Sequence, residues 1–285
     1  MNGTADNRYH VHIDAKPPLM DLKLDQVWLY RDFILIYTKN QFVRRYKQTI
    51  LGPIWLLLNP VLQSLIYTFL FGTVVGVETD GIPYMLFHLV SNGMWTFFST
   101  VFSQCAYTFS RNEHLFGKVH FPRMTVPIAY VLMAAIEFVI SLVPLILYSL
   151  YCYFKLNYVI NFAGLILAPL LLLWLGSMSL GIGILVSSMT AKYRDFSVIV
   201  NLVFRLWMYA TPIVYPLSQL EPGAVRTLIS LNPVTPVIEI YRKMVFGVGE
   251  IYLPGILISV LFTVFVLLLG LIFFNKIEKT FMDTV

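Results

Sequence analysis

Six long apolar stretches constrain the fold of this chain more than any other feature of its sequence. Each approaches or exceeds the roughly 20 residues that a helix needs to cross the hydrocarbon core of a bilayer. Because lipid cannot satisfy free backbone N–H and C=O groups, such stretches are expected to be helices. The alternation with a period of two that marks a transmembrane barrel is absent. The stretches are residues 54–75, 83–105, 126–148, 162–189, 196–214 and 253–274.

The composition of the 285-residue chain agrees with several membrane spans. Hydrophobic residues make up 58% of it and charged residues 12%, whereas a soluble domain is about half apolar and a quarter charged. The mean hydropathy is +0.74. These values exclude a soluble globular protein, a disordered chain and a fibrous repeat. The net charge of +5 is diffuse, so nucleic acid is not expected as a partner. Two cysteines favour neither a disulfide framework nor a thiolate metal cluster.

The first 50 residues differ from the rest of the chain. Residues 1–24 are polar, lack the pattern of a signal peptide, and are expected to form a cytoplasmic tail with no assigned role. Residues 25–50 predict an amphipathic helix in the membrane interface, because aromatic and apolar residues recur at helical spacing and basic residues gather at its end. A soluble helix packed on a partner is the alternative. The residues singled out at the interface and at the start of the first span are Trp28, Arg44, Arg45, Tyr46, Lys47, Gly52, Pro53 and Trp55.

The basic residues predict the orientation of the chain. Fifteen of the twenty Lys and Arg residues fall on one side of the six predicted spans and four fall on the other. Since cytoplasmic loops carry the excess of positive charge, both termini are expected in the cytoplasm. Arg205 and Glu137 lie deep within predicted spans. Such groups are costly in lipid and usually face a cavity or a partner, so a pair between them and a role in a pathway both stay open.

Five motifs occur in order in the polar segments that separate the spans. They are Arg-Tyr-Lys-Gln-Thr-x-Leu-Gly-Pro-x-Trp at residues 45–55, Lys-Val-x-Phe-Pro-Arg at 118–123, Tyr-Arg-Asp at 193–195, Thr-Pro-Ile-Val-Tyr-Pro at 211–216 and Leu-Asn-Pro-x-Thr-Pro at 231–236. In this order they resemble the membrane subunit of bacterial polysaccharide ABC exporters, the ABC-2 type permeases that export O-antigen, capsule or teichoic acid chains. The resemblance covers about residues 25–285. Any one motif is weak, whereas the ordered set is specific.

The resemblance implies an all-α, multi-pass protein of the bacterial cytoplasmic (inner) membrane, of the ABC-2 or type V exporter kind. An interfacial amphipathic helix would precede a six-span domain of residues 51–285. Short re-entrant gate helices would lie before the last span, in the outer gate segment of residues 216–250. Apolar residues that recur at helical spacing after Pro236 agree with this. The gate residues so implied are Asn232, Pro233, Pro236, Tyr241 and Arg242.

The resemblance also implies partners. Two copies of such a permease form a homodimer that encloses a pathway, and two separate ABC ATP-binding subunits drive it. In this chain Gly117-Lys118 is followed by Val119 and not by Ser or Thr, so it is no phosphate-binding loop. ATP and Mg²⁺ are therefore expected on the partner subunit, with no cofactor and no metal on this chain. The other implied partners are a lipid-linked polysaccharide and membrane lipids.

The loop between the second and third spans, residues 109–123, would be the coupling loop that docks into the ATP-binding subunit. The tight turn before the fifth span would complete this contact. The residues so implied are Asn112, Glu113, Leu115, Phe116, Lys118, Phe121, Pro122, Arg123, Tyr193, Arg194 and Asp195.

A glycan needs a wet conduit with aromatic rings on which flat sugar faces can stack. The candidate pathway residues are Tyr67, Trp95, Phe98, Phe102, Arg205 and Tyr209. Most aromatic residues in spans instead face lipid or pack between helices. His88 is expected to be a packed histidine and not a catalytic one. Small residues at 176–183 favour close helix packing within the chain over a dimer seam.

The sequence therefore predicts the permease subunit of an ATP-driven exporter of a lipid-linked polysaccharide, which is not itself an enzyme. An ABC-2 exporter of a small molecule or drug is the alternative. A membrane-embedded glycan-modifying enzyme is disfavoured, because no paired carboxylates lie in a span and no nucleophile stands beside a base.

The predicted topology can be tested with the two cysteines. Cys105 falls at the cytoplasmic end of the second span and Cys152 at the outer end of the third. The two thiols are therefore expected to form no disulfide within one chain. Mass spectrometry of the oxidised protein checks this, and a Cys105–Cys152 crosslink within one chain would contradict the topology.

Overall fold

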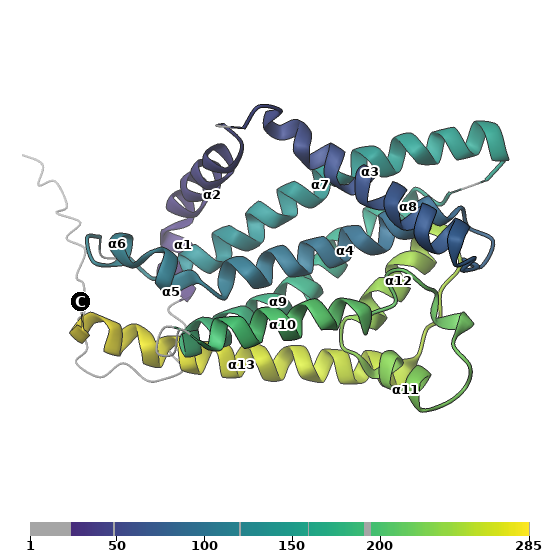
Figure 1. Cartoon of the computed structure of the whole chain (residues 1–285). Helices are drawn as coiled ribbons and strands as arrows, with labels where there is room; N and C mark the ends of the chain where they lie inside the picture. The colour runs from purple at the N-terminus through teal and green to yellow at the C-terminus, as the bar shows by residue number, and fades with distance from the viewer. Residues whose placement is uncertain (1–23, 48, 120, 159, 191–194, 285) are drawn as a thin grey trace, which may run out of the picture.

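The computed structural model describes residues 24–284 apart from residues 48, 120, 159 and 191–194, and every regular element in this part of the chain is a helix (Figure 1). The predicted all-helical fold is thus confirmed. The elements are α1 (Leu24–Leu29), α2 (Arg31–Tyr46), η1 (Gly52–Ile54), α3 (Trp55–Tyr67), η2 (Thr68–Val74), α4 (Tyr84–Cys105), α5 (Thr108–Arg111), α6 (Glu113–Phe116), α7 (Thr125–Leu156), α8 (Ala163–Ile166), α9 (Ala168–Thr190), α10 (Phe196–Tyr209), η3 (Leu217–Gln219), α11 (Ala224–Leu231), α12 (Thr235–Phe246) and α13 (Leu253–Thr284).

All six predicted apolar stretches form helices, and four of the described helices are both long and apolar enough to cross a membrane. These four are Gly52–Val74, Thr125–Leu156, Gly164–Thr190 and Leu253–Glu278. α4 has 22 residues but carries polar side chains such as His88 and Asn92. It can carry them because most of its side chains are buried. α10 is apolar but has 14 residues.

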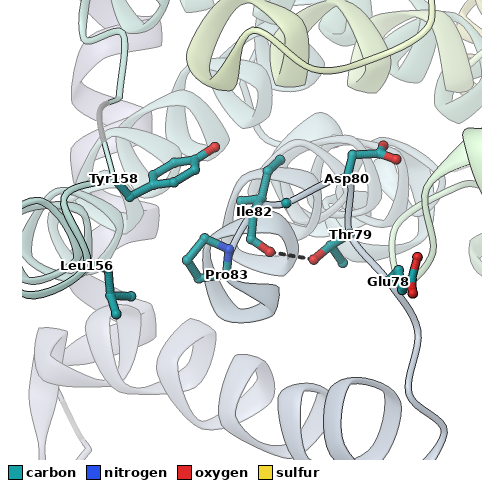
Figure 2. A pocket seen from close by; sticks show the side chains of 8 residues that line it. Glu78, Thr79, Asp80, Ile82, Pro83, Leu156 and Tyr158 are labelled. Atoms are coloured by element: carbon teal, nitrogen blue, oxygen red, sulfur yellow. Dashed lines mark hydrogen bonds between the residues drawn. The ribbon is translucent and has the colours of Figure 1, made fainter.

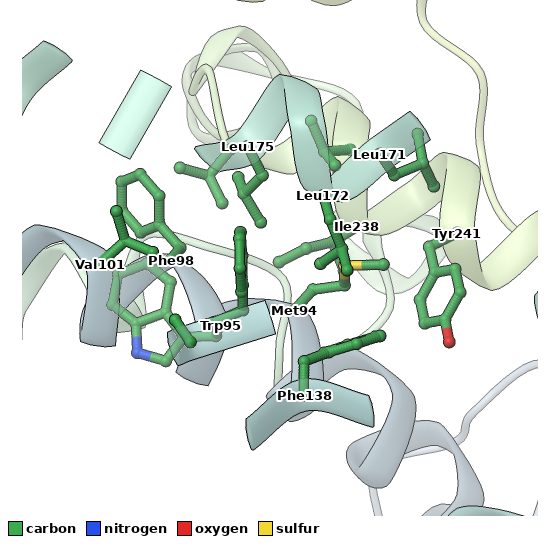
Figure 3. Packing of buried hydrophobic residues seen from close by; sticks show 14 of the residues in the cluster. Met94, Trp95, Phe98, Val101, Phe138, Leu171, Leu172, Leu175, Ile238 and Tyr241 are labelled. Atoms are coloured by element: carbon green, nitrogen blue, oxygen red, sulfur yellow. The ribbon is translucent and has the colours of Figure 1, made fainter. Parts of the chain in front are cut away.

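α4 is the centre of the bundle and packs against α7 and α9. Figure 3 shows Met94 of α4 close to Leu172 of α9 and Ile238 of α12, and the ring of Trp95 beside Phe98 and Val101. Lipid tails are as apolar as these side chains, so helix association in a membrane depends on close van der Waals packing and interhelical hydrogen bonds. The density of this cluster therefore matters more than its hydrophobicity.

α9 and α13 form the most extensive helix pair in the described chain, and two glycines allow their close approach. A Cβ atom on Gly181 would lie 2.7 Å from the backbone nitrogen of Leu267. A Cβ atom on Gly270 would lie 2.5 Å from the carbonyl oxygen of Gly181. The Ser179 hydroxyl donates to the carbonyl oxygen of Phe98 in α4 at 2.6 Å. The small residues of α9 thus pack within the chain, as predicted.

The N-terminal helical region lies against the start of α7. Val27 and Ile34 are buried with Ala129 of α7. The Thr38 hydroxyl donates to the carbonyl oxygen of Ile34 at 2.8 Å and to that of Ala129 at 3.3 Å. Other apolar side chains of α1 and α2, among them Trp28, are exposed. The helix expected over residues 25–50 is present, although it is divided between α1 and α2.

α3 and α10 are the least covered of the long helices. Ser64 is the one buried residue in the helical run Gly52–Val74, and α10 has no buried residue. Large apolar side chains such as Ile66 and Leu202 are exposed on them. Both helices therefore leave an apolar face open on the single chain.

The two ends of the bundle differ in structure (Figure 1). α5, α6 and the C-terminal part of α13 lie at one end, and α11 and α12 lie at the other. Short helices thus precede the last long helix, as expected. Cys105 and Cys152 are both buried free thiols.

Substitution of Gly181 by Ala should destabilise the protein, because the added methyl group meets the backbone of α13 at 2.7 Å. We expect a loss of about 1–3 kcal/mol, typical of overpacking, seen as a lower thermal unfolding temperature in detergent. Gly93→Ala is the matched control, since its Cβ would have an ordinary 3.5 Å contact with Phe138. Equal unfolding temperatures for both variants would contradict the packing described.

Candidate functional site

The predicted coupling loop, residues 109–123, is fixed to the bundle through Asn112. This buried side chain lies between α5 and α6. Its Nδ2 donates to the carbonyl oxygen of Thr108 at 2.8 Å and to the Tyr130 hydroxyl at 3.0 Å. Its Oδ1 accepts a hydrogen bond from the Tyr37 hydroxyl at 2.6 Å. One amide therefore joins α2, α5 and α7.

A cluster of phenylalanine rings holds the coupling loop against the first and last helices of the bundle. The ring centroid of Phe121 lies 4.7 Å from that of Phe33 in α2 and 5.8 Å from that of Phe116. The centroid of Phe109 lies 4.7 Å from that of Phe274 in α13. The loop thus contacts α2 on one side and α13 on the other.

Arg123 closes the coupling loop against the C-terminal part of α13. Its guanidinium lies 5.2 Å above the ring of Phe116, and its Nη1 donates to the carbonyl oxygen of Glu278 at 3.2 Å. The Arg123 backbone N–H donates to Glu278 Oε1 at 3.4 Å. Burial lowers the pKa of the Arg123 guanidinium, and the Glu278 carboxylate opposes that shift. The Arg123 guanidinium therefore contacts groups within the chain, namely the Phe116 ring and Glu278.

The predicted coupling residues therefore divide into two groups. The buried ones fix the loop to the bundle; they are Asn112, Phe116, Phe121 and Arg123. The exposed ones include Glu113 and Lys118, while Leu115 and Pro122 are half-buried. Asp195 is exposed directly before α10. Tyr193 and Arg194 lie outside the described residues.

Glu137, a half-buried carboxylate of α7, is paired with the end of α2. Arg45 Nη1 lies 2.7 Å from Glu137 Oε1, and the Tyr46 hydroxyl donates to the same oxygen at 3.0 Å. Burial first, and then the charge of Glu137, raise the pKa of Tyr46 to about 12. A pair between Glu137 and Arg205, which the sequence left open, is therefore wrong. Sequence spacing within one helix could not show which neighbouring helix supplies the partner.

The break before the first apolar helix is present as predicted. Gly52 has a φ of +53°, a conformation that glycine adopts at no steric cost. Pro53 then lies in η1, and Trp55 begins α3 with its side chain exposed. Arg44 and Lys47 are exposed just before this break. The basic cluster and the turn thus lie together.

Three of the predicted pathway rings are buried inside the bundle. Trp95, Phe98 and Phe102 of α4 surround Phe204 of α10, at centroid distances of 5.4, 5.5 and 3.9 Å. This stack attaches α10 to α4. In this conformation of one chain the three rings pack between helices, which is the alternative that the sequence left open.

The remaining candidate pathway residues lie nearer the surface. Tyr67 is half-buried and stacks on His88 at 4.6 Å, and Arg205 and Tyr209 are exposed on α10. His88 is fully buried, with its Nδ1 2.8 Å from the Ser64 hydroxyl oxygen. The histidine therefore joins α3 to α4 and is packed, as expected.

Asn232 joins the end of α10 to the turn between α11 and α12. Its Oδ1 accepts hydrogen bonds from Trp207 Nε1 at 2.9 Å and from the Val234 backbone at 3.1 Å. Its Nδ2 donates to the carbonyl oxygen of Ala210 at 2.7 Å and to the Thr211 hydroxyl at 3.0 Å. This predicted gate residue thus forms hydrogen bonds both to the end of α10 and to the start of α12.

Two prolines and a tyrosine complete the predicted gate set. The carbonyl oxygen of Pro233 accepts a hydrogen bond from the Ser259 hydroxyl of α13 at 2.5 Å. Pro236 lies in the first turn of α12, where a missing N–H has no cost. Tyr241 is fully buried against Phe138. The helical face predicted after Pro236 is therefore the buried face of α12.

Arg242 and Glu239 form a buried ion pair at the end of the bundle that carries α11 and α12 (Figure 1). Arg242 Nη1 lies 3.2 Å from Glu239 Oε1, with side chains 1% and 2% exposed. Arg242 Nη2 donates to the carbonyl oxygen of Pro212 at 2.6 Å, and its guanidinium lies 4.2 Å above the ring of Phe87. Glu239 Oε2 accepts from the backbone of Glu250 at 3.0 Å. Sequence reasoning missed Glu239, although its place three residues before Arg242 on one helical face was a usable signal.

A pocket of about 720 Å³ lies between the loop after η2 and the end of α7 (Figure 2). Glu78, Asp80 and Tyr158 are among its lining residues. Asp80 Oδ1 accepts a hydrogen bond from the Ser218 hydroxyl at 2.7 Å, so the loop is tied to the outer segment. Among the residues that the structure describes, no group of three or more His, Cys, Asp or Glu could hold a metal ion.

Known proteins are similar in sequence to this chain over most of its length. The model of the ABC-2 type transporter family matches residues 33–246. The O-antigen export system permease protein RfbA of Myxococcus xanthus is 28% identical over 223 residues, which cover 78% of this chain and 83% of the relative. The protein of the same name from Klebsiella pneumoniae is 28% identical over 258 residues, which cover 88% and 94%. The family match ends with α12, so it includes both the coupling loop and the outer helices.

Replacement of Arg242 by Met should destabilise the protein by about 3–5 kcal/mol, because a buried carboxylate loses its counter-ion. Arg226→Met is the matched control. The side chains of Arg226 and Glu250, which form an ion pair, are 28% and 37% exposed. The loss of stability on replacing Arg226 should therefore stay within about 1 kcal/mol. Thermal unfolding of the purified variants in detergent measures the difference. Equal losses of stability in the two variants would show that the Arg242–Glu239 pair does not hold α12 to the segment after α10.

Proposed function

The chain belongs to the ABC-2 type transporter family, and from this we propose that it is the permease subunit of an ATP-driven exporter of a lipid-linked polysaccharide. The observation that supports this substrate class is that relatives spanning most of the chain are O-antigen export permeases. A permease of this family is a transport subunit. ATP hydrolysis, with Mg²⁺, would belong to a separate ATP-binding subunit present in two copies.

We place the permease in the bacterial cytoplasmic membrane, with six spans and both termini in the cytoplasm. α4 and α10 would join the four long apolar helices as spans, α4 because its polar groups are buried and α10 because it is apolar. The end that carries α5 and α6 would face the cytoplasm, in agreement with the excess of basic residues there. α11 and α12 would then form the outer gate.

The coupling loop is built to transmit movement of the ATP-binding subunit. Its exposed residues would contact that subunit, while Asn112 and the phenylalanine cluster connect it to α2, α7 and α13. A loop held by several partners cannot move alone. A shift of α6 would therefore tilt these helices together, as alternating access requires.

The pathway would form between two copies of the chain. α3 and α10 leave apolar faces open, and Arg205 and Tyr209 are exposed on α10. An exposed arginine on a membrane helix is costly unless it meets water, a partner or a cavity. A wet conduit at this face would satisfy it and would present Tyr209 to sugar rings.

Charge reversal of the exposed coupling residues should uncouple transport without unfolding the permease. We expect Glu113→Lys together with Lys118→Glu to lower permease-stimulated ATPase activity, and export of surface glycan, about tenfold, because complementary charges across the interface become repulsive. The measurements are ATP hydrolysis by the purified complex and glycan display on cells. Lys155→Glu, an exposed reversal in the last turn of α7 at the opposite end, is the control.

The same cells test the substrate class. Deletion of the chain should abolish surface glycan and leave lipid-linked glycan in the cytoplasmic leaflet. Normal surface glycan with a defect in efflux of a small molecule would instead favour the drug-exporter alternative. Normal coupling by the Glu113 and Lys118 double variant would show that this loop is not the contact.

A further inference from the structure

The end of α2 carries a basic cluster whose central arginine is held by a carboxylate from another helix. We propose that Arg45, with Arg44 and Lys47, binds the diphosphate headgroup of a lipid-linked substrate. Glu137 forms an ion pair with Arg45 while no headgroup is bound. This inference deepens the proposed function and rests on it. It names the residues that receive the charged part of the substrate.

The position of the cluster suits a lipid-borne anion. Arg44 and Arg45 lie in the last turn of α2, and Lys47 follows it. Leu35 and Ile36 of the same helix are exposed apolar residues, which fits a helix that lies in the membrane interface. The charged phosphate headgroup of a lipid-linked glycan would lie at the same depth. The cluster and the headgroup would thus meet without either leaving the interface.

The charges at this end of α2 do not balance. Three basic residues lie at this end, and the one carboxylate found there among the described residues, Glu137, pairs with Arg45 at 2.7 Å. Within the described part of the chain, Arg44 and Lys47 have no ion pair, and both are exposed. The C-terminal end of the helix adds about half a negative charge. A net positive charge remains, and it favours an anion with more than one charge.

Arg45 can accept a phosphate group with little rearrangement. Glu137 engages its Nη1, and 35% of the Arg45 side chain is exposed. A guanidinium has five N–H donors in a planar fork that matches phosphate oxygens. The remaining donors therefore offer a first contact, after which the headgroup would compete with Glu137 for Nη1.

Glu137 can supply the negative charge beside Arg45 when no headgroup is bound. It lies twelve residues after Thr125, the start of α7, or about 18 Å along the helix. Its side chain is 12% exposed, and such a carboxylate in an apolar helix needs a partner. When a headgroup takes Arg45, Glu137 keeps the hydrogen bond from the Tyr46 hydroxyl at 3.0 Å. With a pKa of about 12, Tyr46 keeps its proton at neutral pH and remains a donor.

Binding of geranylgeranyl diphosphate to the full-length chain in detergent tests the proposal. Arg45→Gln should weaken binding about tenfold, the effect of losing charged hydrogen bonds. Glu137→Gln should strengthen binding several-fold, because the competitor is gone. Lys39→Gln, at an exposed basic residue earlier on α2, should bind as the unchanged chain does. Unchanged binding by Arg45→Gln would overturn the proposal.

A charge swap separates binding from structural support. Arg45→Glu with Glu137→Arg restores an ion pair between the two helices but buries the positive charge on α7. We expect a near-normal unfolding temperature and at least a tenfold loss of binding. If this variant bound the diphosphate normally, the pair would be structural only. Should Arg45→Gln alone unfold, the double variant Arg45→Gln with Glu137→Gln leaves no stranded charge and gives the same readout.

Two further probes identify the source of the anion. Inorganic pyrophosphate should bind at least tenfold more weakly than the lipid diphosphate, because it lacks the anchoring chain. Nanodiscs that contain phosphatidylglycerol should not compete. Equal binding of pyrophosphate, or full competition by phosphatidylglycerol, would overturn a site for a lipid-linked diphosphate.

The outcome can be separated from that of the proposed function, because the binding assay needs neither ATP nor export. Diphosphate binding that requires Arg45, in a chain whose deletion leaves surface glycan unchanged, would support this site and overturn the export role. Loss of surface glycan on deletion, together with normal export by Arg45→Gln, would overturn this site and support the export role.

Discussion

Pairing of polar groups within the chain is the constraint on which the rest of this structure depends. Neither lipid nor the packed interior of a protein supplies the hydrogen bonds that water would, so every buried polar group needs a partner from the protein. Asn112 satisfies this need by joining α2, α5 and α7. Asn232 does the same between α10 and the α11–α12 turn, and Arg242 joins α12 to the segment after α10. Each of these side chains bridges elements that are distant in sequence. The polar minority of residues thereby determines how the apolar helices are connected at both ends.

The contacts that hold the helices together are of two kinds. α9 and α13 are held by backbone approach at glycine, which cannot slide without a clash. α3 touches the bundle through polar pairs, such as His88 with Ser64 and Asn92 with Gln63. Hydrogen bonds of this kind can exchange partners at low cost when a substitute donor or water is present. α4 contacts both α3 and α9, so the two kinds of contact meet at this helix.

Much of the helical layout follows from sequence periodicity. The apolar runs were long enough to require helices, and the buried face of α12 followed from its spacing. Asn112 and Arg123 lie in the predicted coupling loop, and the contacts that they make within the chain were not foreseen. Both satisfy groups within the chain, because a loop between two helices needs partners of its own before it can meet another protein. Glu239 was missed, because its role depends on the full burial of Arg242. Arginine is seldom fully buried, so a buried ion pair was not expected here.

The sequence by itself determined which segments are helices, where the chain breaks before the first apolar helix and between which apolar stretches the basic residues lie. These properties are local, because they depend on run length, on residues such as Gly52 and on the count of charges between spans. Only the tertiary structure decided that Glu137 meets Arg45, that Phe98 and Phe102 pack on Phe204, and which coupling residues remain exposed. The physical reason is that helical periodicity identifies a face of a helix but not the helix that covers it. That choice depends on packing among all helices at once.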